Sequence, residues 1–407
     1  MVGKQTRTLG VCFVRQAAAG GLQGSGRRSD VSEYQSYEFV VLDRRLTAAE
    51  MAELRSISTR AEITPTRFWN EYHWGDLKAD PAKLLARYFD VHVYFANWGS
   101  RRLMFRLPIA AVDVDALRVY LPGGPVALTT TGEHIVVDLC SEADEPEEEW
   151  WEAGQLTASL TPLRAELLRG DLRAAYLAWL LAVQDGEVDP DACEPPVPRG
   201  LGELSAPLMA LVDFLRIDQD LLEVAAQSSG ETGDEGGRFR EWVQQLPAGE
   251  QQRWLLRAVD NPDLALGSVL LGEFRRAHPA VADRQRRTVA QLLARAEELK
   301  DARRREAMRR QAQARAAAAA ARETQLVALG RRGASAWREL EQLVEARSYD
   351  EAVRLVVDLR EVAVRADGLE EFDRRMAEVR QRYARRRGFL DRLRRADPML
   401  VGDPARR

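Results

Sequence analysis

Cysteine, lysine and histidine are scarce in this chain, and their scarcity excludes several kinds of site. The three cysteines, Cys12, Cys140 and Cys193, lie far apart and form no CxxC pair. A structural zinc site needs clustered thiolates or imidazoles, so no zinc module is expected. A sparse, odd number of cysteines is typical of a reducing compartment. Because only four lysines occur in 407 residues, the basic side chains are nearly all arginine.

Long apolar runs and the common catalytic and nucleotide-binding motifs are also missing. No run approaches the roughly 20 apolar residues that cross a bilayer, and the short apolar stretch at 9–14 is followed by no clear cleavage site of a secretion signal. The glycines at 20–26 lack a GK[ST] ending, those at 230–237 lie among acidic residues that repel phosphate, and GxSxG is absent. We therefore expect a cytoplasmic protein without a cofactor or a metal.

Charge is distributed unevenly along the chain, although the net charge is only −4. From Leu271 to the end, 33 basic and 22 acidic residues give +11, so the first 270 residues sum to −15. An acidic body with a basic tail attracts partners of opposite sign. The acidic stretch at 142–149 is one candidate, because it has the charge to dock onto the basic tail of the same chain.

Changes in periodicity predict an α+β N-terminal domain, a mainly α-helical body, a long charged helix and a C-terminal helical hairpin-type module. Ahead of them, residues 1–30 are rich in Gly, Ala and Arg without periodicity, which indicates either a disordered leader or a mis-annotated start with Val31 as the native one. The predicted segments are the leader at 1–36, the α+β domain at 37–140, an acidic linker at 141–155, the helical domain at 156–278, the Ala/Arg-rich helix at 281–329 and the C-terminal module at 334–400.

Local signals locate several elements of the first domain. Thr47 followed by Glu50 is a capping box, and Asp80-Pro81 supplies an N-cap and a proline at the first helical position. Alternating apolar residues predict the strands that follow. The predicted elements are helices at 48–58 and from 80 to about 88, an extended segment at 63–74, strands at 91–97 and 103–107, and a hairpin at 126–139.

Residues 68–107 hold ten of the 29 aromatic residues and two of the four histidines. If 68–74 is a strand, Glu71 and His73 share one face, and alternation in the next two strands adds His92 and Arg106 to it. A carboxylate beside imidazole and guanidinium suits anion binding or acid–base catalysis. Glu71, His73, His92 and Arg106 are therefore the candidate catalytic residues.

A structural explanation of this segment is simpler, and we favour it. A small sheet with one solvated face carries the same polar residues, while its aromatic rings fill the core. A metal site built from Glu71, His73, Asp90 and His92 lacks HExxH or comparable spacing, so no metal ligand is predicted.

The long helix carries two opposing signals. Its first two heptads form a weak coiled-coil seam, so oligomerisation through 281–329 is one prediction. Its arginine clusters also suit phosphate contacts, but no aromatic side chain at 281–325 is present to stack on bases. The seam residues are Val289, Leu292, Ala296 and Leu299, and the possible nucleic-acid contacts are Arg303, Arg304, Arg305, Arg309 and Arg310.

The strings YEFVVLDRRLT, ITPTRFWNEYHWGDL and YFDVHVYFANWGSRRLMFRLP resemble a family of uncharacterised bacterial proteins, and the resemblance covers about 37–227. It implies an α+β head followed by a helical body and assigns no site residues. The tail YDEAVRLVVDLREVAVRADGLEEFDRRMAEVRQRYARRRGFLDRL is similar to helical tails of some bacterial SWIM zinc-finger proteins. Because the CxC…CxH finger is absent, the zinc and nucleic-acid functions of that family are not implied.

Three functions follow as hypotheses. The first is a non-catalytic interaction or scaffold protein of a bacterial multi-protein system, because standard catalytic motifs are absent and the helical surface is large. The second is a nucleic-acid-associated protein that works through its Arg-rich helices. The third is an enzyme of unknown reaction with its site in 68–107.

Overall fold

The computed structural model describes residues 34–143, 153–230, 235–260, 266–278, 286–397 and 400. The chain divides into two compact units, one ending at Lys300 and the other beginning at Asp301. Most of the predicted leader and of the acidic linker lies outside the described residues, as does the docking predicted for 142–149. Within the described ranges, no helix has both the length and the apolar character that a membrane crossing requires.

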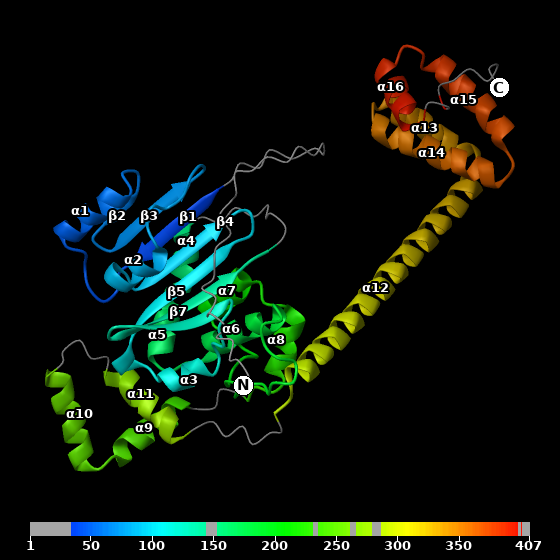
Figure 1. Ribbon diagram of the computed structural model, residues 1–407. Coiled ribbons are helices and arrows are strands. Elements are labelled where there is room, and N and C mark those ends of the chain that lie inside the picture. The colour runs from blue at the N-terminus through cyan, green and yellow to red at the C-terminus, as the bar shows by residue number, and fades with distance from the viewer. Residues whose placement is uncertain are drawn as a thin grey trace, which may run out of the picture. The chain divides into compact units, whose positions relative to one another are not determined.

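One antiparallel sheet organises the first unit (Figure 1). Its strands are β1 (Gln35–Val40), β2 (Glu62–Thr64), β3 (Arg67–Tyr72), β4 (Val91–Ala96), β5 (Arg101–Pro108), β6 (Val126–Thr131) and β7 (His134–Ser141). The strand order is β2-β3-β1-β4-β5-β7-β6, which places the first strand between β3 and β4. Regular structure thus begins within the predicted leader, and the extended segment predicted at 63–74 is divided into two paired strands.

Helices cover both faces of this sheet (Figure 1). On one face lie α1 (Ala48–Ile57) and α2 (Pro81–Tyr88), and their predicted caps are confirmed: Thr47 and Glu50 form the capping box, and Asp80 caps the second helix. The opposite face packs on α3 (Val114–Arg118), α4 (Ala153–Leu160), α5 (Pro162–Leu168), α6 (Arg173–Gln184), α7 (Ala206–Leu215) and α8 (Gln219–Ala226).

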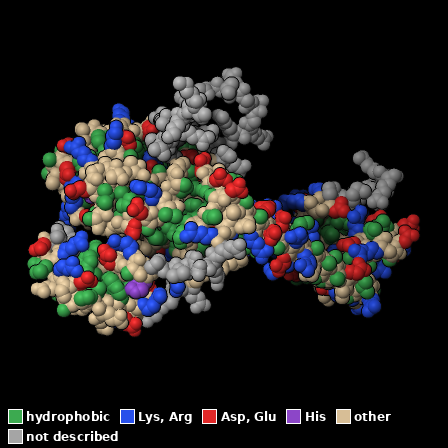
Figure 2. Space-filling model, turned by 60° about the horizontal axis from the view of Figure 1, so that its bottom comes forward, with side chains coloured by type: hydrophobic (Ala, Val, Ile, Leu, Met, Phe, Trp, Pro, Cys, Tyr) green, Lys and Arg blue, Asp and Glu red, His purple; other side chains and the backbone are tan. Residues whose placement is uncertain are grey.

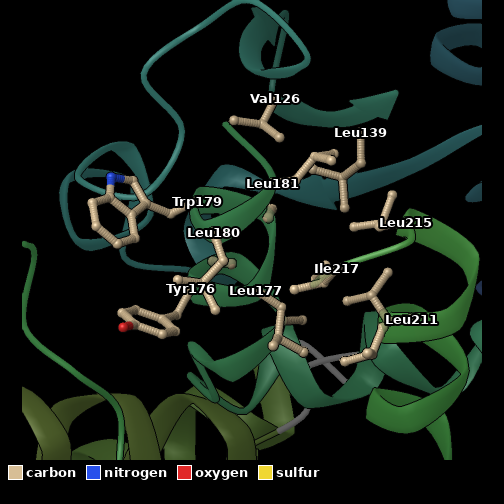
Figure 3. Packing of buried hydrophobic residues seen from close by; sticks show 14 of the residues in the cluster. Val126, Leu139, Tyr176, Leu177, Trp179, Leu180, Leu181, Leu211, Leu215 and Ile217 are labelled. Atoms are coloured by element: carbon tan, nitrogen blue, oxygen red, sulfur yellow. The ribbon is translucent and has the colours of Figure 1, made fainter. Parts of the chain in front are cut away.

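The larger core lies between the sheet and this second group of helices (Figure 3). From β6 and β7, Val126 and Leu139 meet Leu181 of α6, while Leu211 and Leu215 of α7 close the same core. α6 is buried all round, because every residue from Ala174 to Val183 is shielded from solvent. An all-apolar helix of this kind is a central helix and offers no amphipathic surface.

The solvated sheet face expected from the sequence is absent at β4, where all six residues are buried. Val91, Val93 and Phe95 pack in the larger core, and the alternate residues of the strand pack in a second core beneath α1 and α2. Strands that are buried on both faces lose the alternation of polar and apolar residues that marks a half-exposed sheet. The prediction of a solvent-exposed sheet face was wrong because α1 and α2 cover that face.

Three further helices, α9 (Glu235–Gln245), α10 (Ala248–Asp260) and α11 (Leu266–Ala277), form a lobe of the first unit (Figure 1). Aromatic rings hold α9 and α11 together, with the ring centroids of Phe239 and Phe274 5.6 Å apart. In α10 the side chains of Leu255, Leu256 and Val259 remain exposed.

The long helix α12 (Val289–Arg332) begins eight residues later than predicted and continues through Gly330. Its predicted coiled-coil seam packs inside the chain: Val289, Leu292 and Ala296 are buried in the larger core of the first unit. A seam that is covered in this way is not available to a partner helix.

The second unit is helical and has a core of its own. Leu340, Val356, Met376 and Phe389 are buried there, one from each helix that follows α12. The C-terminal module predicted at 334–400 is helical, as expected, and four helices are described there. They are α13 (Ala334–Glu345), α14 (Tyr349–Arg365), α15 (Leu369–Arg382) and α16 (Arg387–Ala396).

Candidate functional site

The four candidate residues of the aromatic segment do not converge. Glu71 pairs with Ser36 of β1, whereas His92 pairs with Phe39 of the same strand. Ser36 and Phe39 are three positions apart, so Glu71 and His92 point to opposite faces of the sheet. Glu71 and His73 are both exposed. The predicted polar face that gathers these residues therefore does not form.

His92 is a fully buried core residue. Its ring stacks on Phe39, with centroids 4.0 Å apart and an interplanar angle of 15°. Nδ1 lies 3.0 Å from the carbonyl oxygen of Glu38, an arrangement in which that nitrogen carries the proton and donates. Burial, assisted by the positive charge of Arg102, lowers the pKa of His92 to about 3. The imidazole is consequently neutral near pH 7 and has no access to a substrate.

Arg106 belongs to a buried ionic cluster that links the sheet to α5. Its Nη2 donates to Asp90 Oδ1 at 2.8 Å, and Arg164 lies 3.6 Å from the same oxygen. Burial raises the pKa of Asp90, but hydrogen bonds from the N–H groups of Leu42 and Asp43 and from Arg106 outweigh it, so the pKa is lowered. Each charged group in this cluster already has a partner, which suits a structural brace and leaves no free acid or base.

A second buried pair on the same side of the sheet has the same character. Arg102 donates to both carboxylate oxygens of Asp138, at 2.8 and 2.6 Å. Across the described ranges, no group of three or more His, Cys, Asp or Glu side chains is arranged to hold a metal ion.

A large cavity lies elsewhere, between the α9–α11 lobe and the sheet domain. It measures about 860 Å³ and is partly open, with walls from α3, the turn between α5 and α6, the loop at 196–199, α9, α11 and Arg286. We call it the arginine cleft. Figure 2 shows basic and hydrophobic side chains side by side over the lobe that forms one of its walls.

Six arginines line the arginine cleft, against Asp113, Asp171 and Glu235, which gives its lining a net charge of +3. Arg173 and Arg275 are neutralised by bidentate pairs with Asp171 and Glu235, and Arg276 pairs with Glu273 and Asp113. The other three, Arg199, Arg238 and Arg286, are exposed and form no ion pair among the described residues.

The sequence did not identify this cleft, and no local signal was available to find it. Arg199, Arg238 and Arg286 come from three segments that are far apart in the chain, and no recognisable motif surrounds any of them. The clusters that the sequence did single out, Arg303–Arg305 and Arg309–Arg310, lie on an exposed stretch of α12.

No family model, curated protein or solved structure matches this chain. The two resemblances inferred from the sequence therefore stay predictions, and the function rests on the geometry of the chain itself.

Proposed function

We propose that the protein is a non-catalytic interaction protein, a scaffold component of a bacterial multi-protein system, and that α12 carries a contact surface for an acidic partner protein. The observation that carries this proposal is the exposure of every residue from 301 to 321 in the middle of α12. A helical stretch this polar and exposed contributes little to a core, since helices in proteins are stabilised mainly by burying one apolar face.

The charge of this stretch indicates the chemistry of the partner. It holds six arginines against Asp301 and Glu306, a net charge of +4. Asp301 pairs with Arg304 and Glu306 with Arg310, which uses both acidic residues. Arg305, Arg309 and Arg315 form no ion pair among the described residues, and the first two lie one helical turn apart on the same side. Carboxylates of a partner are the natural complement.

The candidate segment at 68–107 supports the non-catalytic part of the proposal. Glu71 and His73 are exposed to solvent, whereas His92 and Arg106 are buried in the protein interior. General acid–base catalysis needs such groups within hydrogen-bond reach of one reacting atom.

Nucleic acid is the second candidate, since the same arginines suit phosphates as well as carboxylates. The absence of any aromatic residue between 301 and 322 favours protein, because single-stranded nucleic acids are usually held by base stacking as well as charge. The experiment must therefore separate the two ligands.

Affinity capture with the full chain from a nuclease-treated lysate of the native host tests this proposal. The variant is Arg305→Glu/Arg309→Glu/Arg315→Glu. The matched control is Arg45→Glu/Arg60→Glu/Arg240→Glu, which makes the same change of charge at exposed arginines of the first unit. We expect a partner that is recovered with wild type and control and reduced at least tenfold with the α12 variant.

The other outcomes overturn the proposal. If the partner is recovered equally with both variants, it binds another surface. If wild type retains no partner, the proposed interaction does not exist. Recovery that depends on nucleic acid in an untreated lysate, and is lost after nuclease treatment, replaces the protein partner by DNA or RNA.

A further inference from the structure

We propose that the arginine cleft binds a small organic anion, with an apolar body seated in the cleft and a carboxylate, sulfonate or phosphate group held by Arg199, Arg238 and Arg286. This site goes beyond the partner surface on α12 and is independent of it, because none of the residues that line the cleft lies at 301–321.

The inner wall of the cleft is apolar. Leu117 of α3, Leu167 of α5 and Val269 and Phe274 of α11 are all buried side chains that line it. Leu117 and Leu167 are also part of the larger core, so their positions are fixed by packing on the sheet. A preformed apolar wall of this kind receives a hydrophobic group without first reorganising.

The hydrogen bonds of the polar groups in the deeper wall are already used. Tyr120 donates its hydroxyl to the carbonyl oxygen of Pro196 at 2.7 Å. Arg275 binds Glu235 through two hydrogen bonds and donates a third, of 2.7 Å, to the carbonyl oxygen of Arg169, which fastens the lobe to the end of α5. These contacts build the cleft and leave little for a ligand to hydrogen-bond at its base.

The guanidinium groups of Arg199, Arg238 and Arg286, which form no ion pair among the described residues, give the cleft its preference for an anionic ligand. They reach the cleft from the loop at 196–199, from α9 and from the residue three positions before α12. Burial raises the pKa of Tyr120 to about 12, and the positive charge of Arg286, which lines the same cleft, opposes this rise. Guanidinium groups remain charged at all physiological pH values and bind planar or tetrahedral oxyanions through paired donors.

The shape and size of the cleft point to a small molecule. A volume of about 860 Å³ is within the range of roughly 300 to 1,000 Å³ that is typical of sites for small organic ligands. An apolar wall beside uncompensated positive charge, within a first part of the chain that is otherwise acidic, selects an anion with a hydrophobic body.

Two fluorescent probes that share one ring system test the proposal. They are 1-anilinonaphthalene-8-sulfonate, which carries the anionic group, and N-phenyl-1-naphthylamine, which lacks it. Titrations use the full wild-type chain, the cleft variant Arg199→Ala/Arg238→Ala/Arg286→Ala and the matched control Arg45→Ala/Arg60→Ala/Arg240→Ala. The control includes Arg240, which is exposed on the same helix as Arg238 but does not line the cleft. Circular dichroism verifies that each variant is folded.

We expect the sulfonate to bind wild type at one site and at least tenfold more tightly than the neutral probe. The cleft variant should raise its Kd at least tenfold, and the control at most twofold. Val119→Asp, at an exposed apolar position of the lining, should weaken both probes. Equal effects of the two triple variants, equal affinity for the two probes, or no saturable binding would each overturn the proposal. Because no partner protein is present, failure here is separate from failure of the scaffold role.

Discussion

The guanidinium of Arg164 holds the carboxylate of Asp43 through two hydrogen bonds of 2.9 and 2.6 Å, although the residues are 121 positions apart. The Nε of the same arginine donates to the carbonyl oxygen of Arg106, at 2.9 Å. One side chain of α5 thus joins the loop after β1 to β5. This ionic brace ties the sheet to a helix that packs on it, within the first compact unit.

The first prediction concerns the buried end of this brace. Asp90 is fully buried and accepts hydrogen bonds from the N–H groups of Leu42 and Asp43 as well as from Arg106. Asp90→Ala leaves these donors and a buried positive charge without their partner, which we expect to lower the free energy of unfolding by about 3–5 kcal/mol. Urea denaturation followed by circular dichroism measures the change.

Asp43→Ala is the matched control, because the side chain of Asp43 is half exposed and water replaces much of what it loses. Arg164 is itself buried but keeps Asp90 at 3.6 Å, so we expect a smaller cost, of about 1–3 kcal/mol. Equal costs for the two variants would show that the cluster does not act as a buried brace.

The second prediction concerns pH. The pKa of His92 is about 3 in the folded protein and 6.5 in an ordinary environment. Below pH 6.5 the unfolded chain therefore binds a proton that the folded chain does not, and stability falls as the pH is lowered. At pH 5.5 this histidine alone should cost about 1.4 kcal/mol relative to pH 7.5.

His92→Phe isolates the contribution of the imidazole, because an apolar ring at this position keeps the stacking on Phe39 and does not titrate. Urea midpoints of wild type and variant at pH 7.5 and 5.5 give the comparison. The variant starts from a lower stability, since the carbonyl of Glu38 loses its donor, but should lose less on acidification. An identical loss in both proteins would contradict a neutral buried His92.

The third prediction tests the separate core of the second unit. Leu340 is fully buried in that core, so Leu340→Ala should destabilise it by about 2–5 kcal/mol. Hydrogen exchange resolved by peptide should show lost protection over 334–396 and unchanged protection over 34–226. Leu54→Ala, in the core beneath α1, should give the reverse pattern. Loss of protection throughout the chain in either variant would mean that the two units unfold together.

The fourth prediction is a neutral one. Glu71 and His73 are exposed, and the pair makes no ion pair in the described structure. The double substitution Glu71→Ala/His73→Ala should change the free energy of unfolding by less than about 0.5 kcal/mol. A thermal unfolding scan at pH 7.5 is sufficient. A loss above 1 kcal/mol would show that the ring contact of His73 with Tyr34, with centroids 5.5 Å apart, contributes more than an exposed pair is expected to.

Much of the local structure could be predicted because its causes are local. The capping box of Thr47 and Glu50 and the Asp80-Pro81 start involve residues within one helical turn, and the helical character of the C-terminal module follows from apolar periodicity. The predicted start of α12 is eight residues too early, although a local signal marks the true start: Thr288 and Gln291 form a capping box immediately before Val289. The predicted coiled-coil seam is apolar, but it packs against the first unit of the same chain.

The aromatic segment illustrates the limit most clearly. Its amino acids alone determined that 68–107 would be rich in strands and would fill a core, because large rings gain most when they are buried, although Trp74 remains exposed. Whether one face of β4 would be exposed to solvent was decided by α1 and α2. These helices cover that face, so His92 is buried and neutral. Only the tertiary structure brought Arg199, Arg238 and Arg286 to one cleft, because positions so far apart in sequence meet only through packing.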